Sequence, residues 1–330
     1  MKRLLSGAAR QVDRVSDAYR VNPTALAVFR IVFGLHALVY PRDFTWPGTM
    51  PQEFWTPPLG PMMLFDHIPP LWVLLALQGA VALTALLVTA GLKTRSASFA
   101  LTVLLIIGNG MTYSFGKIDH TILYSLVPAA MALVGWGAAL SLDGLRVGKE
   151  AKASGFALFA WGIVAAFALW TAAYPKLRSG WLDPQREATH GYIAREFARE
   201  PNAAPFTDFM MTIDSSAFWK LLDWFTLFAE GWLVVAVFFP GLFRLGLLLL
   251  STFHVGVYLT LGIDFSFIAF VYAPFFLLPP RLWFPLHNAF SRHVRSRRPV
   301  PLKRRLPDSD EARSASSAGR ATYGHGHQSH

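Results

Sequence analysis

Long runs of uncharged residues divide most of the chain into stretches of about the length of a transmembrane helix. A helix needs about 20 mostly apolar residues to cross roughly 30 Å of hydrocarbon. Three apolar segments contain charges or are short, at 23–40, 221–239 and 265–280. Five charge-free runs meet this length or nearly do, at 67–92, 96–116, 120–142, 153–175 and 245–263. The pattern therefore predicts an all-α, polytopic transmembrane bundle of about eight helices.

The composition points the same way. Hydrophobic residues make up 53% of the chain and charged residues only 15%, whereas about a quarter of the residues of a soluble domain are charged. There is no cysteine, which excludes disulfide scaffolds, Cys-ligated metal clusters and thiol-based redox exchange. The sequence thus describes a multi-pass integral membrane protein whose main partner is the lipid bilayer.

The net charge of +10 lies at the two ends of the chain. Residues 1–23 hold five Lys and Arg against two acids, residues 281–330 hold ten against three, and residues 24–280 hold fifteen against fifteen. Basic segments next to membrane spans stay in the cytoplasm, so this placement predicts cytoplasmic N- and C-termini and no nucleic-acid partner. With that orientation the inner segments collect twenty-one Lys and Arg and the outer loops seven.

We expect three regions in the chain. Residues 1–23 form a basic cytoplasmic segment, 24–285 the transmembrane domain, and 286–330 a basic, disordered cytoplasmic tail. The outer loops 41–68 and 175–219 are long and rich in Trp, Pro and Phe, so the active side is expected to be extracytoplasmic, at the cell (inner) membrane. Within the second loop, residues 185–200 predict an amphipathic helix, either in the headgroup region or packed on the bundle.

Ionisable side chains at membrane depth are candidates for function. Each costs roughly 2.5–3.5 kcal/mol and therefore needs a partner or a role. Arg30 and Glu230 are expected to form a buried ion pair, with a substrate-facing role as the alternative. His254 lies near the middle of an apolar run, where a histidine either bonds a neighbouring helix or serves a ligand. His36, and Asp264 at an outer helix end, complete the set of five.

A second group lies at the predicted outer ends of the helices. His120 begins one span, and Lys176 follows Pro175 at the end of the next. Neighbouring antiparallel helices would bring His120 and Lys176 to the same surface. Lys176 is either a boundary lysine that extends to the water or a partly desolvated lysine whose neutral amine can accept a proton.

The motif inventory favours neither metal nor nucleotide chemistry. His120, His190 and His254 lack HxxxH or HExxH spacing, so no metal site is expected. No GxGxxG, Walker A or GxSxG motif is present, and no internal repeat of the transporter kind is found.

Several segments resemble a known family. In chain order, they are similar to the membrane region of the HTTM (horizontally transferred transmembrane) family, whose best-known member is vitamin K-dependent gamma-carboxylase. The resemblance covers most of residues 20–285. It is carried by ALAVFRIVFGLHALV, GKIDHTILYSLVPAAMAL, AAYPKLRSGW, LLDWFTLFAEG and STFHVGVYLTLGIDFSFIAFVYAPFFLLPP.

The resemblance implies roles for particular residues. Lys176, with Trp181 five residues later, matches the lysine regarded as the base that deprotonates vitamin K hydroquinone. His120, with Tyr124 behind it, matches a histidine that assists the oxygenation steps. By the same resemblance, Arg30, Glu230, His254, Trp181 and Tyr124 would bind or line the site of the quinol.

The implied function is that of a carboxylase- or epoxidase-like lyase that uses vitamin K hydroquinone or menaquinol, with O₂ and CO₂ as co-substrates and no metal. A secreted peptide or protein would be the substrate. The carboxylase, however, carries a large extramembrane domain and a pair of lysines where this chain has one. The alternative is a non-catalytic accessory protein for the maturation or export of a secreted peptide, and a transporter is a third, less favoured interpretation.

Overall fold

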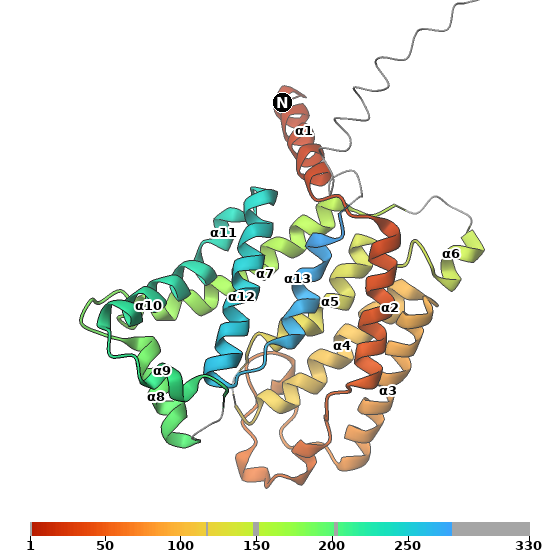
Figure 1. Cartoon of the computed structure of the whole chain (residues 1–330). Helices are drawn as coiled ribbons and strands as arrows, with labels where there is room; N and C mark the ends of the chain where they lie inside the picture. The colour runs from red at the N-terminus through yellow and green to blue at the C-terminus, as the bar shows by residue number, and fades with distance from the viewer. Residues whose placement is uncertain (1, 117, 148–151, 201–203, 279–330) are drawn as a thin grey trace, which may run out of the picture. The chain divides into compact units, whose positions relative to one another are not determined.

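The computed structural model describes residues 2–116, 118–147, 152–200 and 204–278, with no strand among them (Figure 1). Two compact units are distinguished, residues 1–283 and 284–330. The predicted tail, 286–330, lies outside the described residues. The helices of the first unit confirm the all-α fold class of a membrane bundle.

Seven helices correspond to the first seven predicted segments. Six more helices of the described residues are short or lie outside those segments: α1 (Lys2–Ala18), α6 (Leu142–Val147), α8 (Ala188–Arg199), α9 (Thr207–Met211), α11 (Leu233–Ala236) and α13 (Ala269–Tyr272). The seven are α2 (Pro23–Val39), α3 (Leu71–Ala90), α4 (Thr94–Tyr113), α5 (Thr121–Val134), α7 (Gly155–Arg178), α10 (Ser216–Gly231) and α12 (Pro240–Leu261).

Fewer helices than the eight predicted meet the length and hydropathy that a membrane span requires. Helices α3, α4, α7 and α12 are long and apolar enough to cross a bilayer. A fifth crossing results if α1 (Lys2–Ala18) and α2 form one span, although their axes bend by 61° at the break. The structure therefore supports an integral membrane protein with four or five such helices in its described part, and the count of eight is not confirmed.

Two predicted spans are broken into short pieces. The segment 221–239 becomes α10 and α11, which meet at Trp232, and Pro240 then begins α12. The segment 265–280 becomes the 3₁₀ turn η4 (Ser266–Ile268), α13 (Ala269–Tyr272) and the 3₁₀ turn η5 (Ala273–Phe276). Pro274 has no backbone N–H and so cannot continue the helical bonding of α13.

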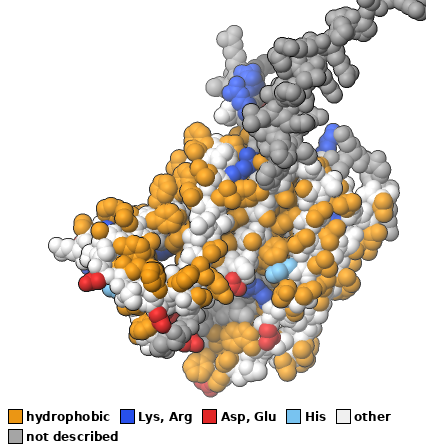
Figure 2. Space-filling model, viewed as in Figure 1, with side chains coloured by type: hydrophobic (Ala, Val, Ile, Leu, Met, Phe, Trp, Pro, Cys, Tyr) orange, Lys and Arg blue, Asp and Glu red, His pale blue; other side chains and the backbone are white. Residues whose placement is uncertain are grey.

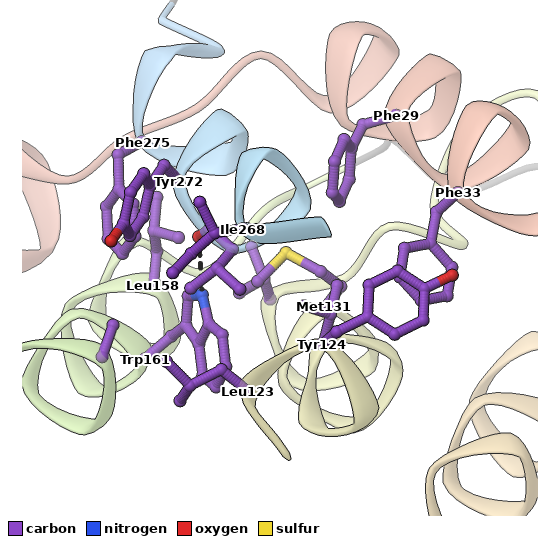
Figure 3. Close-up of a cluster of buried hydrophobic side chains, with 14 of the residues drawn as sticks. Phe29, Phe33, Leu123, Tyr124, Met131, Leu158, Trp161, Ile268, Tyr272 and Phe275 are labelled. Atoms are coloured by element: carbon purple, nitrogen blue, oxygen red, sulfur yellow. Dashed lines mark hydrogen bonds between the residues drawn. The ribbon is translucent and has the colours of Figure 1, made fainter. Parts of the chain in front are cut away.

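The broken segment 266–276 packs in the hydrophobic core (Figure 3). Trp161 of α7 donates its indole N–H to the backbone oxygen of Val271, 3.2 Å away. Phe33 of α2 stacks on Tyr124 of α5 and meets Phe270 edge to face, with ring centroids 4.9 and 5.4 Å apart. The core thus closes around an irregular segment rather than a full helix.

Apolar side chains also cover the outside of the unit. Hydrophobic residues occupy most of the face in Figure 2. Leu75 and Leu86 of α3 and Leu248 of α12 are each more than half exposed. Such a surface is unfavourable in water and suits contact with lipid chains.

Arg30 does not form the predicted pair with Glu230. The guanidinium, which is fully buried, donates to the backbone oxygens of Trp136, Ala139 and Leu140, at 3.1, 3.2 and 2.5 Å. These carbonyls lie just after α5 ends, where helical hydrogen bonds run out. Arg30 therefore supplies hydrogen bonds to carbonyl groups of the turn that follows α5. The predicted ion pair with Glu230 is wrong.

We predict that Arg30→Leu lowers the free energy of unfolding in detergent by roughly 3 kcal/mol, because buried carbonyls lose charge-assisted hydrogen bonds. Thermal or denaturant unfolding of the purified protein measures this. Arg20→Leu is the matched control, since Arg20 pairs with Asp17 at the surface, where both side chains are about two-thirds exposed; a surface pair contributes about 0–1 kcal/mol. Equal stability of wild type and Arg30→Leu would contradict the account.

Candidate functional site

A buried ion pair joins the end of α7 to α10. Lys176, in the last turn of α7, places its Nζ 2.6 Å from Oε1 and 2.5 Å from Oε2 of Glu230. The Glu230 side chain is 7% exposed and that of Lys176 is 24% exposed. The partner of Glu230 is thus the lysine at the helix boundary, where the C-terminal end of the helix dipole also favours a cation.

Trp181 covers the Lys176 ammonium. Gly180 adopts a left-handed conformation, with φ +87°. The backbone N–H of Trp181 donates a hydrogen bond to the backbone carbonyl of Lys176, at 3.4 Å. This hydrogen bond is typical of a Schellman motif at a helix C-terminus. Glycine is favoured at its left-handed position because it has no Cβ atom to clash with the backbone. The indole consequently turns back over the helix end, with its ring centroid 5.4 Å from Lys176 Nζ and only 8% of the residue exposed.

His254 is the buried histidine of α12. Its ring stacks on Phe265, with centroids 4.5 Å apart, and the residue is 7% exposed. Its Nδ1 has no hydrogen-bond partner among the described residues. A buried polar atom without a partner costs about 1–3 kcal/mol, so this nitrogen calls for an explanation.

A pocket of about 530 Å³ opens beside His254. One wall is α12 and the other is the segment that contains Phe265 and Ile268. Val255 and Tyr258, which also line the pocket, are 56% and 50% exposed on the outside of α12. The pocket therefore opens sideways, toward the surface that lipid would cover.

His120 stands close to the same wall. It occupies the position just before α5, and its ring centroid is 6.3 Å from that of Phe265. Asp119 accepts a hydrogen bond from the Thr121 backbone N–H at 2.8 Å and thereby caps the helix start. The rings of His120 and His254 thus both lie near Phe265.

Tyr124 belongs to a different cluster. Its hydroxyl lies 3.0 Å from Nδ1 of His36, and the Arg42 guanidinium lies over its ring at 5.6 Å. Arg42 in turn donates to the buried Asn109 at 3.3 Å. Of the predicted cofactor-binding residues, Glu230 and Trp181 contact Lys176 and His254 lines the pocket, whereas Tyr124 and Arg30 are placed elsewhere.

Three residues of this region were missed by reasoning from the sequence. Tyr272 is 2% exposed, its hydroxyl has no partner among the described residues, and its ring lies nearly parallel to that of His254 at 6.3 Å. Lys220 and Asp223 form a buried pair at 2.9 Å. The i, i+3 spacing of Lys220 and Asp223 on a helix could have signalled this pair, whereas nothing in the sequence marks Tyr272.

The predicted amphipathic helix is present as α8, and it packs on the bundle. Ile193 is 1% exposed and lies in a cluster with Met210 and Trp219. Tyr192 stays 46% exposed. These contacts favour the second of the two interpretations of residues 185–200.

The histidine of α8 takes part in side-chain contacts of its own. His190 stacks on Trp219, with centroids 4.5 Å apart, and its Nδ1 lies 2.9 Å from Glu187. Hydrogen bonds from Ser216 and His190 lower the pKa of the Glu187 carboxyl. Among the described residues, no group of three or more His, Cys, Asp or Glu side chains could hold a metal ion.

Comparison with known families matches residues 19–280 to the HTTM domain. A search of curated proteins found no match, nor did a search of solved structures. The match covers most of the chain and includes every residue of the cluster around Lys176.

We predict strong coupling between Lys176 and Glu230 in a double-mutant cycle. Lys176→Met should lower the free energy of unfolding by about 3–5 kcal/mol, because it leaves the buried Glu230 carboxylate without its partner. Glu230→Gln should lower it by less, because the Lys176 side chain is 24% exposed and water can solvate its charge. The double variant should lose much less than the sum. The matched cycle of Arg30→Met with Glu230→Gln should be additive, and coupling in this second cycle but not in the first would contradict the assignment.

Proposed function

Because the chain belongs to the HTTM domain family and is an integral membrane protein, we propose that it is a quinol-dependent oxygenase of the carboxylase type. In this proposal a vitamin K hydroquinone or menaquinol binds in the pocket beside His254. Lys176 is the base and His120 assists. O₂ and CO₂ are the co-substrates, and the active side is extracytoplasmic.

The observation that carries the proposal is that His254, whose buried Nδ1 has no hydrogen-bond partner among the described residues, is one of the residues that line the pocket. A quinol hydroxyl would donate a hydrogen bond to this nitrogen and remove the cost of leaving it bare. The aromatic face of Phe265 lies beside the same space, where a quinone ring can stack. The site thus offers a polar anchor and an apolar wall to one ligand.

The pocket also suits the rest of such a ligand. An isoprenoid chain is long and apolar, and it would reach the site from the bilayer rather than from water. The exposed side chains of Val255 and Tyr258 at the lining place the opening on that route. Lipid-soluble substrates would thus have a route to the pocket from the bilayer.

The Lys176–Glu230 pair can hold and accept protons. In an apolar surrounding, a carboxyl and an amine share one proton between an ionic and a neutral form. In the neutral form the proton rests on Glu230 and Lys176 is a free amine. Lys176 can then take the hydroquinone proton and become an ammonium, whose charge stabilises the quinol anion that is left.

A quinol bound there would supply, with O₂, the reducing equivalents and the strong base needed to remove a carbon-bound proton that CO₂ then replaces. Trp181 and Phe265 keep water away from the amine and from the imidazole. The substrate of this carboxylation step would be a peptide or protein side chain on the extracytoplasmic side.

One observation favours the non-catalytic alternative. The Lys176–Glu230 pair also ties α7 to α10, so the lysine could serve only to hold two helices together. An accessory protein for the maturation or export of a secreted peptide would need the pair for its fold but would turn over no quinol.

The decisive assay follows quinone epoxide by mass spectrometry. Purified protein in nanodiscs receives vitamin K hydroquinone or menaquinol and O₂, with a Glu-containing peptide and labelled bicarbonate. We expect Lys176→Ala to lower the rate by about 100-fold or more, as the loss of a general base does. His254→Phe should weaken quinol binding about tenfold, the equivalent of one lost hydrogen bond.

Lys93→Ala is the matched control, because Lys93 is an exposed lysine that precedes α4, away from the cluster. It should leave the rate at the wild-type value. Incorporation of the bicarbonate label into the peptide would show that the protein is a carboxylase as well as an oxygenase. Folded wild-type protein that makes no epoxide from either quinol would reject the enzyme and favour the accessory role.

A further inference from the structure

Two charged side chains of α10 are buried beside Lys176, although the proposed reaction does not use them. Lys220 is 7% exposed and Asp223 is fully buried. Their side chains meet at 2.9 Å, between Nζ and Oδ2. Burying such a pair is costly and often contributes little net stability, so a specific use for it is worth seeking.

The Asp223 carboxylate holds the start of α8. It accepts hydrogen bonds from the backbone N–H groups of Ala188 and Thr189, at 3.1 and 2.8 Å, and from the Thr189 hydroxyl at 2.7 Å. These amides have no partner within the helix, and the positive end of the helix dipole favours an anion there. Asp223 thus docks the twelve-residue α8 on α10.

Lys220 completes the connection to the site. Its ammonium also donates to the backbone oxygen of Trp181, at 3.3 Å. Trp181 is the residue whose ring lies 5.4 Å from Lys176 Nζ and whose N–H points back to the Lys176 carbonyl. A continuous set of contacts therefore runs from α8 through Asp223, Lys220 and Trp181 to Lys176.

We propose that Lys220 and Asp223 form a clasp that holds Trp181 over the Lys176 amine. They are positioning residues: neither contacts the pocket, and both act through the indole. The assignment rests on the proposed function only in naming Lys176 as the base. Its physical content is that the clasp, through Trp181, limits the access of water and dissolved reagents to this amine.

The test is the rate at which a water-soluble, amine-reactive reagent labels Lys176 in nanodiscs, read by peptide mass spectrometry with the exposed Lys93 as internal reference. Trp181→Ala should speed the labelling of Lys176 about fivefold, the factor expected for the loss of one ammonium–indole contact. Lys220→Met should give a comparable increase, because it frees the Trp181 carbonyl. Asp223→Asn should also label faster than wild type.

Arg199→Gln is the control, on α8. Arg199 pairs with Glu196 and its side chain is 71% exposed, so this variant should label at the wild-type rate. Lys220→Arg, which keeps a charged donor, should restore slow labelling. That rescue would not occur if Lys220→Met acted only by loosening the fold.

Two results would overturn the clasp. One is fast labelling in Trp181→Ala with wild-type rates in both Lys220→Met and Asp223→Asn. The other is an unchanged rate in Trp181→Ala itself. If Lys220→Met does not fold, Asp223→Asn still tests the clasp. Asparagine keeps a side-chain oxygen that can accept hydrogen bonds from the start of α8, but it loses the charge that pairs with Lys220. No quinol is present in this experiment, so its result stands whether or not the protein makes epoxide.

Discussion

The buried ion pair between Lys176 and Glu230 is the interaction on which the candidate site depends. It fixes the end of α7 against α10, one residue before α10 itself ends. Trp181 lies over the Lys176 ammonium, with its ring centroid 5.4 Å from Nζ. Because an apolar surrounding strengthens electrostatic interactions, a change in the proton count of this pair is felt by every group around it.

The polar side chains buried in this bundle fall into two kinds. Arg30 and Asp223 bond backbone groups at a turn and at a helix start, and Asn109 bonds Ser125 and so links α4 to α5, although Nε of Arg30 has no partner among the described residues. His254 leaves a nitrogen without a partner beside a pocket. A membrane protein keeps a costly group of the second kind where a ligand can complete it, which is the physical basis for placing the ligand there.

Much of the fold could be predicted from the sequence, because hydropathy reports directly on the lipid-facing helices. The predicted runs 67–92 and 245–263 correspond to α3 and α12 within a few residues. The breaks in 221–239 and 265–280 were not foreseen, since a short irregular segment in the core is as apolar as a helix. The orientation of the bundle in the membrane remains a prediction.

The site was predictable only in part, for a geometric reason. Position along a span gives depth, so His120 and Lys176 could be assigned to one end of the bundle, and the structure places His120 near Phe265 and Lys176 in the last turn of α7. Depth does not say which way a side chain faces around the helix axis. Arg30 and Glu230 therefore looked like partners, yet they face different neighbours, and the orphan hydroxyl of Tyr272 had no sequence signal at all.

The central claim is most directly tested by joining the pair covalently. A hydrophobic carbodiimide activates buried carboxylates in membranes, and an activated Glu230 in contact with the Lys176 amine should form an amide bond between the two side chains. Peptide mass spectrometry of the wild-type protein should find this cross-link, and Lys176→Met should abolish it. Glu230 modified by the reagent while Lys176 stays a free amine would show that the two side chains are apart and would contradict the account.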